Sequence, residues 1–204
     1  MVKSVNTILT VLLLCVVCTA NAQDRTEIFV SKSDTAVHYR IPAIAALPDG
    51  SVVAVADYRF SRNDIGIVKD GRVDLRVRTS NDNGCGWGEI STVIEGKGKD
   101  SPDFMNVGFG DPALVADRKT GRLLLMCAAG NVSVLDGTRE CHLRIPRFYS
   151  EDGGKTWKEG CLVTDGPTAY SDLTMPDDRH LAVLYETGLE TPYERIEWTV
   201  YQLQ

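Results

Sequence analysis

The stretches SNDNGCGW (residues 80–87) and SEDGGKTW (residues 150–157) share the pattern Ser-x-Asp-x-Gly-x-x-Trp. In this pattern the Asp can accept hydrogen bonds from turn amides, the Gly takes a positive φ, and the Trp packs over the turn from the next strand. Each stretch therefore predicts a hairpin turn. Two copies with all four residues in place indicate a repeated unit and predict the blades of a β-propeller.

Short runs with an apolar period of two surround these turns. They are SVVAVADYR (51–59), DLRVRTS (74–80), GRLLLMCAAG (121–130), LRIPRFYS (143–150) and HLAVLYET (180–187). This period predicts β-strands joined by hairpins. No run after residue 22 keeps a 3.6-residue period for more than two turns, so the predicted fold class is all-β.

The first 22 residues have the features of a signal peptide. Lys3 gives a short positive region, residues 8–17 are apolar but too few to span a bilayer, and Ala20-Asn21-Ala22 resembles a cleavage site. We expect the chain to be exported to the periplasm, the cell surface or the medium. The 182 residues at 23–204 are enough for one domain with its own core.

The net charge of −6 argues against nucleic acid and against an anionic membrane surface as partners. No stretch after residue 22 is long and apolar enough to cross a membrane. Histidines, cysteines and carboxylates show no metal-site spacing, so neither a metal nor another cofactor is expected.

Four cysteines lie beyond the signal peptide, at Cys85, Cys127, Cys141 and Cys161. Their even number in an oxidising compartment allows disulfides. The alternative is burial as small hydrophobic side chains. Both interpretations stay open at this point.

The motif YRIP at 39–42, together with the two Ser-x-Asp-x-Gly-x-x-Trp stretches, resembles the bacterial and animal sialidases. These enzymes remove terminal sialic acid from glycans. The resemblance implies a six-bladed β-propeller with its active site at the end of the central channel opposite the two turns. It also implies a sialylated glycan as substrate and no cofactor.

The resemblance assigns Arg40 to the arginine triad that holds the carboxylate of sialic acid. A planar guanidinium binds a carboxylate through paired, charge-assisted hydrogen bonds. Asp64 matches the acid/base that protonates the leaving oxygen and then activates water, with Asp57 and Asp70 as rivals. The alternatives are that Arg40 forms a salt bridge with a neighbouring acid and that Asp64 is a solvated loop residue.

Tyr170, in GPTAYSDLTMPDD (166–178), matches the family's nucleophile. Sialidases use a tyrosine because a carboxylate nucleophile would be repelled by the substrate's own carboxylate. Glu186 corresponds to the acid that orients the first arginine. Arg59 and Asp111 match positions that contact a ring hydroxyl of the sugar. Tyr170 could instead be a packed aromatic, and Asp111, which precedes Pro112, a turn former.

The resemblance covers about 27–160 as the front blades and about 165–204 as the final blade. Six blades of ~45 residues need about 270 residues, so we expect the middle of the domain to be missing. In relatives the missing part carries two further arginines and the Glu that serves the tyrosine as base. Arg144 and Arg147 precede a turn as ordinary blade strands do, and we do not assign them to the triad.

Three functions follow from these observations. The first is a retaining exo-α-sialidase, and the second is an inactive sialidase-like propeller fragment that at most binds glycans weakly. The third is a propeller that serves protein interactions. The third would require both the Arg-Ile-Pro and the Tyr-Ser matches to be chance.

Overall fold

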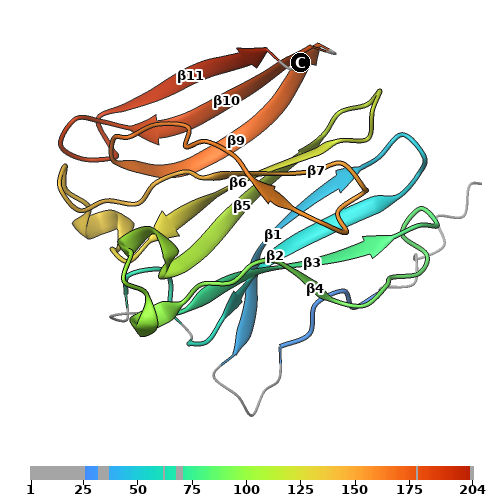
Figure 1. Cartoon of the computed structure of the whole chain (residues 1–204), viewed down its shortest axis with the longest axis horizontal. Helices are drawn as coiled ribbons and strands as arrows, with labels where there is room; N and C mark the ends of the chain where they lie inside the picture. Colours follow the sequence, from blue (N-terminus) through green and yellow to red (C-terminus); the bar gives the residue numbers. More distant parts are fainter. Residues whose placement is uncertain (1–25, 32–36, 62, 68–70, 178, 203–204) are drawn as a thin grey trace, which may run out of the picture.

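The computed structural model describes residues 26–31, 37–61, 63–67, 71–177 and 179–202 (Figure 1). The predicted signal peptide at 1–22 and the rival acid Asp70 lie outside the described residues. No helix in the described part of the chain is long and apolar enough to cross a membrane.

Three antiparallel units follow one another along the chain. The first unit contains β1 (His38–Ala46), β2 (Val52–Arg59), β3 (Val73–Ser80) and β4 (Ser91–Ile94). The second unit contains β5 (Gly108–Ala116), β6 (Leu123–Gly130), β7 (Arg147–Ser150) and β8 (Lys158–Glu159). The third unit contains β9 (Thr168–Asp177), β10 (His180–Thr187) and β11 (Arg195–Gln202). A single parallel pair, Val73 with Gly108, joins the first two units into one sheet.

Helical structure in the described residues is limited to three short 3-10 turns, η1 (Gly98–Asp100), η2 (Phe104–Asn106) and η3 (Val134–Asp136). The all-β prediction is therefore confirmed. Four predicted strands match β2, β3, β6 and β10 closely. The run at 143–150 pairs continuously only over β7, since Pro146 has no N–H to donate to a ladder.

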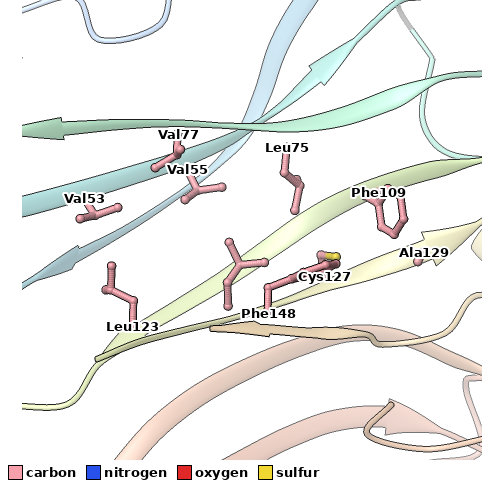
Figure 2. Close-up of a cluster of buried hydrophobic side chains, with 10 residues drawn as sticks. Val53, Val55, Leu75, Val77, Phe109, Leu123, Cys127, Ala129 and Phe148 are labelled. Atoms are coloured by element: carbon pink, nitrogen blue, oxygen red, sulfur yellow. The ribbon is translucent and has the colours of Figure 1, made fainter. Parts of the chain in front are cut away.

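The units stack face to face because alternate residues of each strand point to opposite sides. Figure 2 shows the core between the first and second units, where Val53, Val55 and Leu75 face Leu123 and Cys127. A second core lies between the second and third units, where Met126 and Ile145 meet Leu181, Val183 and Tyr185. The period of two that predicted the strands therefore also places β6 between two cores.

The first strands of the three units lie side by side in the order β1, β5 and β9 (Figure 1). This places the start of each unit along one side of the stack. The strands form no closed ring within the described residues.

The two Ser-x-Asp-x-Gly-x-x-Trp stretches form the predicted turns. Asp82 Oδ1 accepts the N–H of Gly86 at 2.7 Å, and Asp152 Oδ1 accepts the N–H of Thr156 at 2.9 Å. Each Trp indole donates to the carbonyl of the turn glycine, Gly84 or Gly154, and both glycines have positive φ, 87° and 88°. The hydroxyl of Thr156, followed by its backbone amide, lowers the pKa of the Asp152 carboxyl to about 2. The conformations expected from the pattern are confirmed in both copies.

Both turns lie at the same end of the stack. Ser80 pairs with Val52 at the start of β2, and Ser150 pairs with Leu123 at the start of β6. The other end of β2 carries Arg59. Side chains after Arg59 are therefore a full strand length away from the turns.

The four cysteines as a group show neither the disulfide bonds nor the burial that the sequence analysis considered. Cys127 is buried in the first core, but Cys85, Cys141 and Cys161 are exposed, so burial as small hydrophobic side chains is wrong for these three. All four thiols are free. The exposed cysteines lie in turns and loops, where a period of two gives no information about burial.

Candidate active site

The candidate site lies at the end of the stack opposite the two turns. Each unit contributes one residue from its first strand: Arg40 from β1, Asp111 from β5 and Tyr170 from β9. Arg59 ends β2, and Asp64 lies in the loop that follows. The units thus bring together side chains that are up to 130 residues apart in the sequence.

Arg59 is buried beneath the site, where its guanidinium contacts acids from two sides. Its Nε and Nη2 donate to Asp57 Oδ2 at 3.0 and 2.7 Å, and Nη2 lies 3.1 Å from Asp64 Oδ1. Asp111 Oδ1 lies 4.0 Å from the same Nη2. One cation therefore holds three carboxylates together. The sequence analysis had assigned only Asp64 and Asp111 to the site.

Asp57 was a rival to Asp64 in the sequence, but the structure buries it completely. Its Oδ1 accepts the N–H of Asp111 at 3.0 Å, so it links β2 to β5. Burial raises the pKa of Asp57 to about 7, against the opposing effect of Arg59. Asp57 and Arg59 are two residues apart on one strand, so their side chains point to the same side. This spacing could have identified the pair from the sequence.

Asp111 sits at a bulge in β5 and not in a turn. Its φ is 54°, and the ladder with β6 shifts between Gly110 and Ala113. A Cβ at position 110 would lie 3.2 Å from Asp57 Oδ2, so glycine lets the strand approach the buried acid closely. Burial, followed by the charge of Asp64, raises the pKa of Asp111 to about 6.

Asp64 presents its carboxyl to the pocket, with 42% of the side chain exposed. Its Oδ1 accepts the N–H of Ile65 at 2.8 Å. The next residue, Gly66, has φ 70° and packs so closely on the backbone of Val132 that a Cβ would overlap it. This contact holds the loop of Asp64 against the second unit.

Tyr170 lies beside Asp64 and Asp111, and all three line a pocket of about 170 Å³. The charge of Asp111, then burial and the charges of Asp64 and Glu186, raise the pKa of the phenol. Glu186 Oε2 accepts the backbone N–H of Tyr170 at 3.4 Å. The acids thus favour the neutral form of the phenol.

The apolar wall of this pocket comes from η3 and the segment before β7. It includes Val134, Leu135 and Leu143, and the polar Ser133 lies beside them. The sequence analysis did not predict these residues for the site, because no motif there indicates a pocket wall. They share a site with Asp64 only because the second unit folds against the loop after β2.

Arg40 has an exposed side chain at the pocket end of β1. The next residue, Ile41, has φ 47° and precedes Pro42, as Asp111 precedes Pro112. The charge of Arg40 lowers the pKa of Asp111 against the stronger effect of burial. Within the described residues, no ion pair joins Arg40 to any carboxylate, including Glu186. Arg40 also lines an apolar groove on the outer side of the first unit.

Carboxylate oxygens of Asp57, Asp64 and Asp111 lie within 4.8 Å of one another, a geometry that the sequence did not predict. Such a group could hold a divalent cation. Here Arg59 Nη2 lies within 4.0 Å of an oxygen of each acid and supplies the positive charge. We therefore assign no metal to this cluster.

Arg144 and Arg147, in and after the second Arg-Ile-Pro motif, do not line the pocket. Arg147 stacks over the Tyr201 ring, 4.6 Å from its centroid, and donates to the carbonyl of Cys161. Arg144 approaches Asp165 at 4.0 Å. Both arginines tie the second unit to neighbouring segments.

Comparison with known proteins gives matches to sialidases in both sequence and structure. The chain is 30% identical to a sialidase of Paraclostridium sordellii over 152 residues, which are 72% of this chain and 35% of that protein. It is 31% identical to a sialidase of Micromonospora viridifaciens over 135 residues, which are 63% of this chain and 20% of that protein. The chain is a relative of the sialidase family.

A solved structure, the Hadza microbial sialidase Hz136, matches this chain with a TM-score of 0.58 at 23% identity. The match covers 79% of this chain and 34% of that structure. No family model matches the chain. This sialidase relative therefore spans between about a fifth and a third of the proteins it resembles.

Proposed function

We propose that this chain is a sialidase-type glycosidase, exported from the cell, whose pocket binds the terminal sialic acid of a glycan. Its three units would be part of a six-bladed β-propeller. The observation that carries the proposal is the shared pocket of Asp64 and Tyr170, a candidate proton donor and a candidate nucleophile from different units. The similarity of the chain to sialidases supports the substrate class.

In the proposed reaction, Tyr170 attacks the anomeric carbon while Asp64 protonates the departing glycan oxygen. Asp64 then removes a proton from the water that releases sialic acid with retained configuration. Tyr170 must lose its own proton during the attack. The raised pKa of the phenol means that a nearby base has to take that proton.

We expect slow catalysis because the pocket is acidic. Sialic acid brings a carboxylate to a site that already holds Asp64 and Asp111. Among the described arginines, Arg59 is paired with Asp57 and Asp64, and Arg40 is an exposed cation near the pocket. Removing one preorganised electrostatic partner commonly costs about 10²–10³ in rate. This acidity supports the second candidate function, weak glycan binding without turnover.

A fluorogenic sialoside tests the proposal, with the Micromonospora viridifaciens sialidase as reference. We expect turnover below the reference and a further loss of about 10²–10⁴ in Asp64→Asn, because general acid catalysis is removed. The single variant Tyr170→Phe should abolish turnover. Tyr149→Phe, which removes a hydroxyl on β7, is the matched control and should turn over like the unaltered chain.

Two results would decide against hydrolysis. No turnover, combined with saturable binding of sialic acid that Arg40→Met abolishes, would leave the weak binding function. Turnover that survives Tyr170→Phe would show that another residue is the nucleophile.

A further inference from the structure

The outer face of the third unit is apolar and uncovered. Leu184 pairs with Trp198, and Val200 and Ile196 alternate with it along β11, so these four exposed side chains share one face of the sheet. Trp198 is 55% exposed on this face. The opposite face of the sheet packs in the core with β6, so the exposed side chains point away from the rest of the chain. We call Leu184, Ile196, Trp198 and Val200 the β11 face.

The outer side of the first unit is also apolar and carries a groove. The groove has a volume of about 430 Å³ and lies between β1 and residues 26–29. Its lining includes Phe29, Tyr39, Pro42, Ile44 and Ala56, and Ile44 is 63% exposed. We call this feature the β1 groove. Contiguous exposed apolar surface of this kind is typical of interaction sites.

The third unit and the first unit lie at the two ends of the stack (Figure 1). The β11 face and the β1 groove are on the sides of these units that face away from the two cores. The third unit presents protruding side chains, and the first unit presents a hollow. The two surfaces also differ in charge. Asp172 pairs with Leu184 and Glu186 pairs with Ile196, so both acids flank the β11 face, whereas Arg40 lines the β1 groove.

We propose that two copies of this chain associate head to tail, with the β11 face of each copy in the β1 groove of the other. Three units from each copy then form one closed ring of six. The arrangement covers all four apolar surfaces and leaves none exposed. If only one face entered one groove, the pair would keep one groove and one face free. Further copies could then add at these free surfaces and form an open filament.

The size of the contact is sufficient for a stable dimer. Eight-residue strands at about 3.3 Å per residue, three abreast at about 4.8 Å, give a face of roughly 380 Å². Two contacts with two faces each bury roughly 1,500 Å², and stable interfaces bury about 1,200–2,000 Å². The charges agree with this pairing because each contact brings Arg40 toward Asp172 and Glu186 of the other copy.

The closed ring also bears on the candidate site. Arg40 has no ion pair within its own chain among the described residues, and Glu186 is beside Tyr170. Association would bring acidic side chains of the second copy close to Arg40 and would close the ring around the end of the stack where Tyr170 lies. The inference rests on the ring arrangement proposed above and not on catalysis, so it can fail or hold independently of turnover.

Sedimentation of the full chain without substrate tests the dimer. We expect a particle of twice the 22.4 kDa chain mass, less any cleaved leader. Ile44→Asp and Trp198→Asp should each give monomers, because each places a charge in an apolar contact. Leu189→Asp alters a side chain that is 64% exposed in the β10–β11 turn, outside both surfaces, and should stay dimeric. Circular dichroism checks that each variant is folded, and Ile196→Asp replaces Trp198→Asp if that variant unfolds.

Mixing the two monomeric variants separates this arrangement from others. The intact β1 groove of the Trp198→Asp chain can accept the intact β11 face of the Ile44→Asp chain, so the mixture should form a weaker heterodimer. A dimer that only Trp198→Asp disrupts would show face-to-face pairing and overturn the proposal. A monomeric unaltered chain at tens of micromolar, or a filament, would also overturn it.

Discussion

Arg59 and Asp57 form a buried ion pair beneath the pocket, with 2.7 Å between Arg59 Nη2 and Asp57 Oδ2. They lie two residues apart on β2, so both side chains point to the same side of the strand. Asp57 also accepts the backbone N–H of Asp111. The pair therefore connects the first unit to the second and fixes the positions of the acids above it.

Removing the cation from this pair should destabilise the fold strongly. Arg59→Met leaves buried carboxylates without their partner, and we expect a loss of about 3–5 kcal/mol in the free energy of unfolding. Arg122→Met removes an exposed ion pair with Glu151 and should cost about 0–1 kcal/mol. Urea titration of both variants measures the difference. Equal losses would contradict the central position of Arg59.

The buried acids should make stability depend on pH. The folded-state pKa values of Asp57 and Asp111 are raised to about 7 and about 6, above the ordinary 3.8 of an aspartate. Between about pH 4 and pH 7 the folded chain therefore holds more protons than the unfolded chain, so this contribution to stability falls as pH rises. Asp57→Asn cannot ionise and should flatten the slope. An unchanged slope would show that Asp57 is charged throughout this range.

Asp111 should control the ionisation of Tyr170. Its charge is the largest cause of the raised pKa of the phenol, so Asp111→Asn should lower the pH at which Tyr170 ionises. Nuclear magnetic resonance of chains with labelled tyrosine follows this residue separately. Asp117→Asn removes an aspartate from the turn between β5 and β6 and should leave the titration of Tyr170 unchanged. An effect of equal size from Asp117→Asn would indicate a general change in net charge.

The second turn needs glycine at position 154. Gly154 has φ 88°, and a Cβ there would lie 3.2 Å from Val53 Cγ1. Gly154→Ala should cost about 1–2 kcal/mol, because this backbone conformation is unfavourable for a residue with a Cβ. Gly160→Ala is the control, since its Cβ would meet its nearest neighbour at 3.6 Å, and we expect less than about 0.5 kcal/mol. Thermal unfolding compares the two, and similar losses would contradict a special role for the turn.

The sequence by itself predicted β2, β3, β6, β7 and β10 and the two turns, because their causes are local. A period of two in β2 or β10 follows from alternation along one strand, and the roles of Asp152 and Gly154 depend on residues within the same turn. The resemblance also pointed to Asp64 and Tyr170. Their spacing in the chain gave no indication that they line one pocket.

Only the tertiary structure decided the burial of Asp57 and Arg59, the exposure of three cysteines, and the apolar wall of the pocket near Leu135. Each of these features depends on which units stack against each other. It also decided that the β11 face stays uncovered, since its alternation resembles that of the strands whose two faces are both buried. Alternation shows that a face is apolar, but the surface that covers it belongs to another unit or to another chain.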